Sequence, residues 1–343
     1  MGEHADHHQI PRTYLRAWST NGHSLWQMDI SKKIIERVNI NNHFYTKHEY
    51  SINPGAMNLL PDEMESFFND FHFLNVQYNG MQLNTAELLN RFYPFYDQWE
   101  IYDKEMHIIS PHKKNALRNS IIEKRDISIE IQLQKYEAKW PKYRDELIRR
   151  VIESKLTWID AYSLGYFVRF MVLLHWRGFG RSVAENKAFE TIEDIVPLSE
   201  ISISPENRIH KNSTNARLEV SRDFRLNYFR QFFDNEGLIY DHAIRAIPKA
   251  TLLILVAPQN CRFITSDSPC NVFGLKDNQL GLPISPLFYI AFTKKLSSND
   301  RYIIKRIAAS NVDKINMITY QKADSFVMGV SETDLERLAG LID

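Results

Sequence analysis

The longest apolar stretch of the chain, "TWIDAYSLGYFVRFMVLLHWRGFG", runs from Thr157 to Gly180 and is long enough to cross a bilayer. It carries Asp160, Arg169 and His175, and each of these ionisable side chains is unfavourable in lipid. A helix buried inside a folded protein accommodates the same apolar residues and can give the charged ones partners. The stretch therefore predicts a core helix and no membrane span.

The overall composition sets limits on the fold and on the function. With 343 residues, of which 44% are hydrophobic and 12% aromatic, the chain is globular and forms one interlocked unit or two unequal lobes. Lys plus Arg and Asp plus Glu both number 42, so any nucleic-acid site must be local. The N-terminal "MGEHADHHQIP" lacks the features of a signal peptide, and only two cysteines occur, which together predict a cytoplasmic protein.

The first two thirds of the chain change from strand-like to helix-like patterning. "HSLWQMD" and "KIIERVN" are rich in strand-forming residues and predict a β-hairpin. After Pro61, apolar residues recur at helical spacing, and Glu63 and Glu65 suit the start of a helix because of its dipole. Longer helical patterns follow over about residues 113–182, with a break near Pro141, and over about 216–235. The middle of the chain is therefore predicted to be helical.

The last third returns to strands. "TLLILVA" and "CRFITSD" predict a second hairpin, "LPISPLFYIAFT" a further strand, "SNVDKINMITYQKA" a helix capped by Ser310, "SFVMGVS" a strand and "ETDLERLAGLI" a helix. The order β, long α, β predicts an α+β fold, and the two β portions should share a sheet because each is too small alone. We expect a β element (1–60), a helical region (61–236) and an α+β region (237–343), the first and last forming one unit.

Several short motifs occur together in an order that resembles a known family. The first is "HHQIPRTYLRAW", with His8, Pro11, Tyr14, Leu15, Arg16 and Trp18 at its defining positions, and "LWQMDISKK" and "NNHFYT" follow it. The central "LHWRGFGR" carries Arg177, and the late motifs comprise Thr265, Ser266, Asp267 and Pro269, then Pro283, Ser285 and Pro286. Over nearly the whole chain this series resembles the uncharacterised bacterial family DUF4238. The resemblance implies a shared fold and a set of candidate positions, but no reaction.

Four of these positions carry side chains that suit chemistry on a phosphodiester. His8 could carry a proton, and the carboxylate of Asp267 could orient its imidazole. Arg16 and Arg177 could hold a phosphate. Each group also has a structural interpretation: His8 in a local turn, Asp267 in an Asx turn, and Arg177 in an ion pair at the end of a helix. The residues alone leave both interpretations open.

Two functions follow from these alternatives. One is a hydrolase of RNA or DNA, a nuclease acting as a bacterial defence or toxin-like effector, with His8, Arg16, Arg177 and Asp267 in one cleft and with a divalent metal ion left open as a cofactor. The other is a non-catalytic binding or scaffold module for a protein or nucleic-acid partner. The cluster of His and Asp before Gln9 has metal-ligand chemistry, but the side chains of an extended segment alternate in direction, so we expect only adventitious metal binding there.

The N-terminal motif should also be an anchor for the fold. We expect it to pack against the turn that carries Asp267, because pairing the first hairpin with the late strands brings these segments to one edge. Tyr14, Leu15 and Trp18 should be buried, with His8 and Arg16 facing a pocket.

Overall fold

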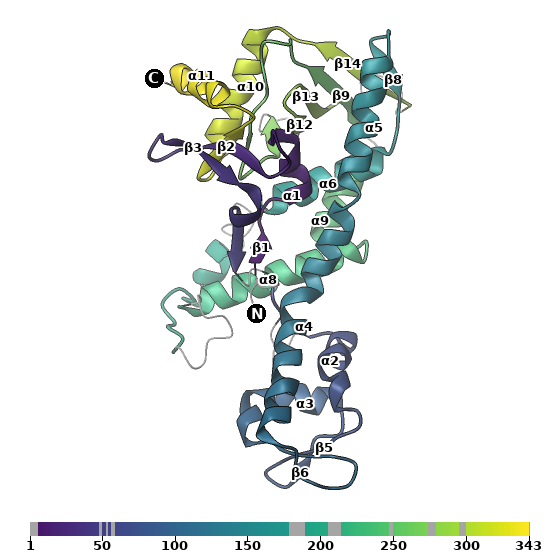
Figure 1. Ribbon diagram of the computed structural model, residues 1–343, viewed down its shortest axis with the longest axis vertical. Helices are drawn as coiled ribbons and strands as arrows, with labels where there is room; N and C mark the ends of the chain where they lie inside the picture. The colour runs from purple at the N-terminus through teal and green to yellow at the C-terminus, as the bar shows by residue number, and fades with distance from the viewer. Residues whose placement is uncertain are drawn as a thin grey trace. The chain divides into compact units, whose positions relative to one another are not determined.

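The structure, a computed structural model, shows helices and several sheets, so the predicted α+β fold is confirmed (Figure 1). It describes residues 6–47, 50–52, 54–55, 59–177, 189–204, 214–246, 250–273, 279–294 and 300–342. Two compact units are present: unit 1 (residues 1–7, 47–133 and 192–230) and unit 2 (8–46, 134–191 and 231–343). The predicted division at residues 60 and 236 stays a prediction, because compactness does not test whether a part folds on its own.

A four-stranded antiparallel sheet in unit 2 joins the two ends of the chain. Its order is β10-β15-β2-β3, and the strands are β2 (Ser24–Asp29), β3 (Ile35–Asn39), β10 (Thr265–Ser266) and β15 (Phe326–Gly329). The predicted first hairpin and the shared sheet are both confirmed. Helix α11 (Glu332–Ile342) lies beside β2 and β3, where its Leu335 and Leu338 share a core with Met28 and Val327 (Figure 1).

A six-stranded sheet is the second layer of unit 2. Its order is β11-β12-β13-β9-β14-β8, and only β9 and β14 run parallel to each other. Its strands are β8 (Trp158–Asp160), β9 (Ala250–Val256), β11 (Asn271–Phe273), β12 (Gln279–Ser285), β13 (Phe288–Lys294) and β14 (Arg301–Arg306). Helix α10 (Ala309–Lys322) covers part of one face, with Val312 and Ile315 against Tyr289 and Ala291.

Three local predictions in this part of the chain are wrong. "TLLILVA" pairs with β13 and β14, which occupy both of its edges, so it forms no hairpin with "CRFITSD". "LPISPLFYIAFT" is two strands that turn at Pro286 and Leu287, because proline ends one strand and cannot donate to the next. Ser310 lies inside α10, whose N-cap is Ala308.

Further helical segments also belong to unit 2. They are α1 (Arg12–Leu15), η1 (Arg16–Trp18), η2 (Ile40–Asn42), α5 (Trp140–Glu153), α6 (Leu164–Arg177) and α9 (Gly237–Ala246). The predicted core helix is confirmed over α6, although Trp158–Asp160 forms strand β8 instead. In the described part of the chain, no helix is both long and apolar enough to span a membrane.

Unit 1 combines a small sheet with helices around an aromatic core. The sheet has the order β6-β5-β7, with β5 (Asn75–Tyr78), β6 (Met81–Gln82) and β7 (Glu100–Tyr102). The helices are α2 (Pro61–Phe68), η3 (Asn69–Phe71), α3 (Ala86–Phe92), η4 (Tyr93–Gln98), most of α4 (Pro111–Glu137) and most of α8 (Ala216–Phe233). The predicted break in the long helical stretch is confirmed, because α4 ends before Pro141 and α5 begins beside it. The capping role expected of Glu63 is confirmed as well, because its carboxylate accepts the N–H of Leu60 at 3.0 Å.

Candidate functional site

Three of the motif segments meet at the side chain of Tyr14 in unit 2. Tyr14 lies on the short helix α1 after Pro11 and is fully buried. Its hydroxyl donates to the carbonyl of Pro283 at 2.7 Å and lies 2.8 Å from Oγ1 of Thr265. Because a phenol has one proton and a carbonyl only accepts, Thr265 is the donor in the second bond. The start of the chain is thereby joined to both late motifs.

A second connection lies close by, at Trp18. Its indole Nε1 donates to the carbonyl of Phe263 at 3.2 Å, and the N–H of Phe263 donates to the carbonyl of Pro286 at 2.7 Å. Tyr14, Leu15 and Trp18 each have no exposed surface, so their predicted burial is confirmed. The N-terminal motif is therefore an anchor that packs against the late motifs.

The two titratable groups at this junction are held neutral. Burial raises the pKa of Tyr14 well above its ordinary value, and the hydrogen bond from Thr265 only partly opposes this. Burial also raises the pKa of the nearby Cys270 thiol, which is a free cysteine. A neutral phenol and a neutral thiol are poor nucleophiles, so the junction does not provide an activated nucleophile.

Asp267 connects two strands of the four-stranded sheet. Its Oδ1 accepts the N–H of Asp324 at 2.9 Å, and its Oδ2 accepts the N–H groups of Ser325 at 2.6 Å and Phe326 at 3.0 Å. These amides lie at the start of β15, so the partners are not in the turn of Asp267 itself as an Asx turn requires. Burial raises the pKa of Asp267 to about 6, and the amide hydrogen bonds act in the opposite direction.

This raised pKa predicts a pH dependence of stability. An aspartate in an unfolded chain has a pKa of about 3.9, whereas Asp267 has a pKa of about 6 in the folded protein. At a pH between these values, the folded protein binds more protons than the unfolded chain. The stability that Asp267 contributes is therefore fully present below the lower pKa and is lost as the pH rises through the higher pKa. We expect the unfolding free energy of the wild type, relative to Asp267→Asn, to fall by up to about 3 kcal/mol from pH ~4 to ~7. Urea denaturation at four pH values measures it, and a constant difference would contradict the prediction.

Arg177 forms a buried ion pair with Glu137. Arg177 ends α6 and Glu137 ends α4, and their side chains are 2% and 10% exposed. The main-chain carbonyl of Glu137 also accepts a hydrogen bond from Oγ1 of Thr13 at 3.3 Å, within the N-terminal motif. The central motif is thus tied to the first one through Glu137. A phosphate could reach this guanidinium only by displacing a carboxylate, which supports the structural interpretation of Arg177.

The other two candidate residues, His8 and Arg16, lie in the N-terminal motif. His8 lies on β1 (Asp6–His8), which pairs with β4 (Tyr45–Lys47), and its side chain lies outside the described residues. Arg16 is exposed on η1, and its side chain makes no hydrogen bond or ion pair with the residues that are described. The convergence of His8, Arg16, Arg177 and Asp267 in one cleft stays a prediction. No group of three or more His, Cys, Asp or Glu that could hold a metal ion occurs among the described residues.

A run of aromatic rings leads from Tyr14 to Tyr162. The ring centroids of Tyr14 and Trp140 are 6.2 Å apart, and Trp140 is stacked on Phe170 at 4.1 Å. The run continues from Phe170 to Tyr166, Tyr143 and Tyr162 at successive distances of 6.0, 4.2 and 5.8 Å. Dispersion between the stacked and tilted rings of this run stabilises the packing of α5 on α6.

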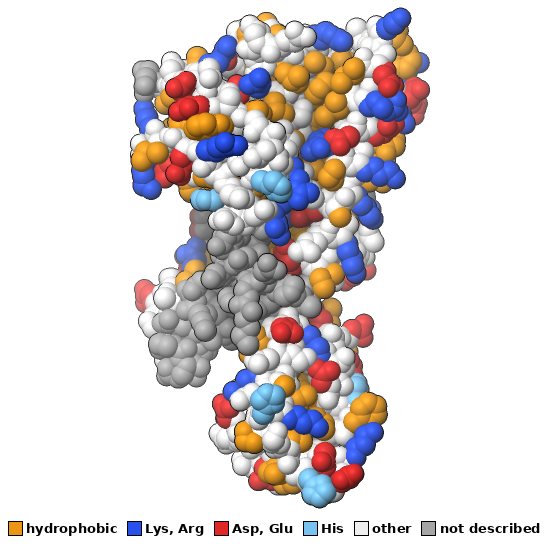
Figure 2. Space-filling model, viewed as in Figure 1, with side chains coloured by type: hydrophobic (Ala, Val, Ile, Leu, Met, Phe, Trp, Pro, Cys, Tyr) orange, Lys and Arg blue, Asp and Glu red, His pale blue; other side chains and the backbone are white. Residues whose placement is uncertain are grey.

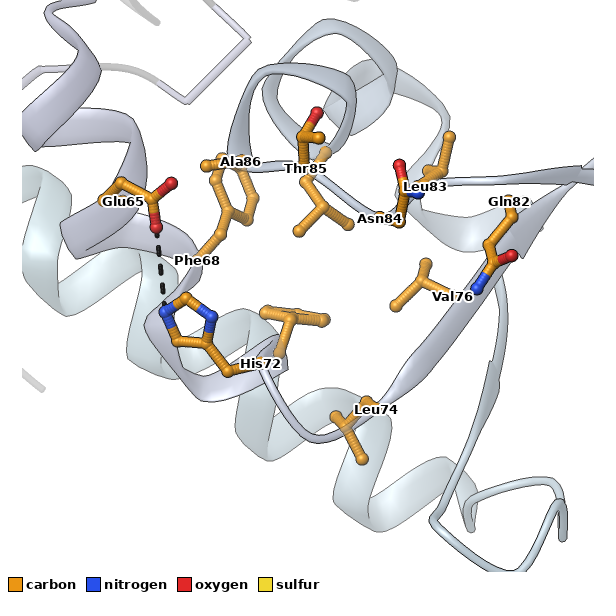
Figure 3. A pocket seen from close by; sticks show the side chains of 12 residues that line it. Glu65, Phe68, His72, Leu74, Val76, Gln82, Leu83, Asn84, Thr85 and Ala86 are labelled. Carbon is orange, nitrogen blue, oxygen red and sulfur yellow. Dashed lines mark ion pairs between the residues drawn. The ribbon is translucent and has the colours of Figure 1, made fainter.

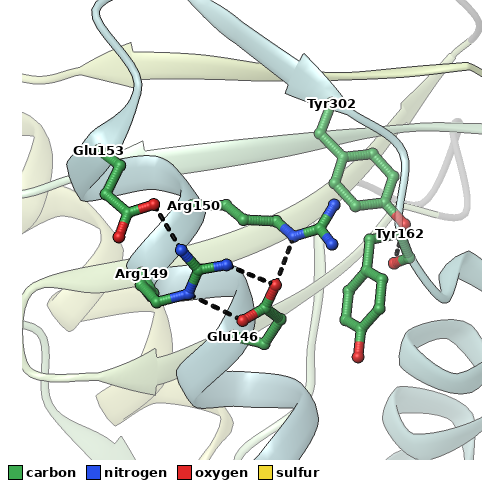
Figure 4. Close-up of polar contacts among 6 residues, drawn as sticks. All are labelled: Glu146, Arg149, Arg150, Glu153, Tyr162 and Tyr302. Atoms are coloured by element: carbon green, nitrogen blue, oxygen red, sulfur yellow. Dashed lines mark hydrogen bonds and ion pairs between the residues drawn. The ribbon is translucent and has the colours of Figure 1, made fainter.

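At the far end of this run, charged side chains of α5 surround Tyr162 (Figure 4). The guanidinium of Arg150 lies 4.5 Å from the centroid of the Tyr162 ring, and Tyr302 donates to the carbonyl of Tyr162 at 2.5 Å. Glu146 accepts from Arg149 at 2.8 and 2.9 Å and from Arg150 at 2.7 Å, and these hydrogen bonds lower its pKa to about 2. The charge of Arg149 is therefore balanced by Glu146 and Glu153 of the same helix.

Sequence reasoning missed the partners that complete the junction. Glu137 lies in a polar part of α4, where nothing distinguishes it from solvated glutamates. The partners of Asp267 are main-chain amides, which carry no sequence signal. The pairing of Tyr14 with Thr265 had a weak signal, because both belong to motifs of the same family, but no motif states which atoms meet.

The protein has an α+β fold in which the N-terminal, central and late motifs meet in the core of unit 2. Comparison with protein families gives a match over residues 6–333 to the family described as "Protein of unknown function (DUF4238)". The chain belongs to this family, as its motifs implied. Searches of the curated proteins and of the solved structures each found no match.

Proposed function

We propose that this protein is a non-catalytic recognition module that binds single-stranded nucleic acid on the six-stranded sheet of unit 2. The observation that carries this proposal is a row of two cationic side chains, an isoleucine and a tryptophan on the face of the sheet that α10 covers only in part. Arg301, Ile303 and Lys305 alternate along β14 and therefore point to the same side. Trp158 is paired with Ile303 in the neighbouring strand β8, and so belongs to that face too.

The cations of this row are available to an anionic partner. The guanidinium of Arg301 lies 3.9 Å from the centroid of the Trp158 ring, and Arg301 and Lys305 are both exposed. Neither has an ion-pair partner within the described ranges. Asp160 stands opposite Arg301 in the strand pairing and is the one acidic residue of the registered pairs between β14 and β8. The row therefore carries a local excess of positive charge on a chain whose formal net charge is zero.

The same face offers apolar surface for bases. Ile303 is paired with Leu253 of β9, and both are half-buried, as is Trp158. Figure 2 shows hydrophobic side chains at the surface over β9, β13 and β14, with Lys and Arg side chains nearby. Unstacked bases can lie on such a surface while the phosphates contact the cations, whereas a duplex hides its base faces. This favours a single strand over a duplex.

The polar motif residues support recognition over catalysis. Asp267 is bonded to three main-chain amides, Arg177 is paired with Glu137, and Tyr14 is a neutral donor inside the core. Groups that hold a fold together in this way are poorly placed to act on a substrate. A hydrolase of RNA or DNA is the second candidate, and the exposed Arg16 on the same segment as His8 is the observation that favours it.

Replacing Arg301 and Lys305 together by alanine should weaken the binding of a labelled single-stranded RNA by about tenfold or more. If each cation contacts one phosphate, the slope of log K against log salt should also fall by about 1.4 in magnitude. Fluorescence anisotropy at several salt concentrations measures both quantities. Asp160→Asn removes the opposing charge and should tighten binding, which makes it a matched control on the same strands.

Outcomes of the same experiment separate the two candidates. Equal binding by the wild type and the Arg301→Ala/Lys305→Ala variant would remove the support for this face. The RNA, and a DNA of the same sequence, should stay intact with and without Mg²⁺ or Mn²⁺. Degradation that His8→Ala abolishes would instead establish the hydrolase.

A further inference from the structure

Unit 1 contains a cavity of about 370 Å³ that the proposed function does not use (Figure 3). It lies between α2, the segment that leads into β5, and the start of α3. A cavity of this size lies within the range that holds small organic ligands. Its lining, all within the described part of unit 1, consists of Glu65, Phe68, Phe71, His72, Leu74, Val76, Gln82, Leu83, Asn84, Thr85, Ala86 and Leu89.

One part of the lining is apolar and well packed. Phe68, Phe71, Val76, Leu83 and Leu89 are 1 to 6% exposed, so their positions are fixed by the core of the unit. Phe68 and Phe71 also contact each other edge to face, with ring centroids 6.0 Å apart. These side chains form a rigid apolar floor of the cavity.

The other part of the lining is polar and open to solvent. Glu65 and His72 face each other, with 3.7 Å between Oε2 and Nε2, and their side chains are 59% and 58% exposed. Glu65 lies beyond the first turn of α2, so it does not have the capping role that we expected from the sequence. Figure 3 shows Gln82 across the cavity from His72. Gln82 and Asn84 are exposed and make no hydrogen bond with described residues, so their carboxamides are free for a ligand.

The charges of the lining select the kind of ligand. The lining holds one carboxylate and no lysine or arginine. A phosphate or carboxylate ligand would therefore be repelled by Glu65 and would find no lysine or arginine to pair with. A protonated amine can replace the long contact between Glu65 and His72 with a short charge-assisted hydrogen bond. The hydroxyl of Thr85 already caps α3, where it accepts the N–H of Leu88 at 3.2 Å, so Glu65 is the charged acceptor that the lining offers.

We propose that this cavity binds a small organic cation, an ammonium or amidinium group carried on a flat apolar ring. The ring lies on Phe68, Phe71 and Leu89, the cationic group meets Glu65, and the carboxamide of Gln82 bonds the other edge of the ligand. This site is independent of the proposed nucleic-acid surface, which lies in unit 2.

Three probes that share one ring test the assignment: tryptamine, the neutral tryptophol and the anionic indole-3-acetate. By calorimetry with the full chain near neutral pH, tryptamine should bind at least about tenfold more tightly than indole-3-acetate. Glu65→Gln should reduce the affinity for tryptamine by about tenfold, to that of tryptophol. Glu87→Gln changes an exposed carboxylate of α3 outside the lining and should have no effect.

Filling the cavity with Ala86→Phe should abolish binding of all three probes, and a thermal melt establishes that this variant is folded. Glu65→Gln alters an exposed side chain and keeps the test valid if Ala86→Phe does not fold. Absence of tryptamine binding, equal binding of the anion, or an unchanged affinity in Glu65→Gln would each overturn the proposal.

Discussion

Replacing Glu137 by glutamine should lower the free energy of unfolding by about 3 to 5 kcal/mol. The substitution keeps the shape of the side chain and removes its charge, so the buried guanidinium of Arg177 loses the carboxylate with which it is paired. Arg177 is 2% exposed and cannot turn toward water without disrupting α6. Urea denaturation followed by circular dichroism measures the change.

A double variant provides the control for this pair. Glu137→Leu with Arg177→Met removes both charges together and should recover most of the stability that Glu137→Gln loses, because apolar side chains suit the same space. Glu153→Gln breaks an ion pair with Arg149 whose two side chains are more than half exposed, and it should change stability little. If the single variants of Glu137 and Glu153 cost the same, the pair with Arg177 does not have the structural role assigned to it.

Replacing Asp267 by alanine should lower the free energy of unfolding by about 2 kcal/mol or more at neutral pH. The carboxylate accepts the main-chain N–H groups of Asp324, Ser325 and Phe326, and alanine offers them no acceptor. The three main-chain N–H groups at the start of β15 would then lose their acceptor. The same denaturation experiment measures the change, and hydrogen exchange of the three amides locates it.

Asp324→Ala is the matched control, because it removes a neighbouring exposed carboxylate and keeps the main-chain N–H. It should leave stability nearly unchanged. The comparison also bears on function, because a residue that acts on a substrate can usually be removed without loss of stability. A stable Asp267→Ala protein that has lost a biochemical activity would return Asp267 to the candidate catalytic residues.

Much of the fold could be predicted where the alternation of apolar and polar residues indicates which face of a strand or helix is buried. The hairpin of β2 and β3 and its union with late strands followed from alternation and from the small size of each part. The partners of β9 were predicted wrongly because the strand is apolar along its length, as expected for a strand with neighbours on both edges. Such a run does not indicate which strands will be its neighbours.

The candidate site was harder to predict than the fold. Charged residues in motifs draw attention to chemistry, but their partners decide what they do. For Asp267 and Arg177 the partners are main-chain amides and a glutamate forty residues away along the chain. Tyr14 and Trp18 could be assigned to the core because aromatic residues at the start of a chain need a surface to cover them.

The bonds of Tyr14 have a consequence for synthesis on the ribosome. The carbonyl that accepts the hydrogen bond from its hydroxyl belongs to Pro283, which follows 269 residues later. At about 5 to 20 residues per second, roughly 13 to 54 s pass between the translation of Tyr14 and that of its acceptor. During that interval the N-terminal motif lacks the native surface that the late motifs supply, so we expect chaperones to bind its apolar side chains. Chains terminated before Pro283 should accumulate as aggregates or be degraded, because unit 2 cannot close without its last third.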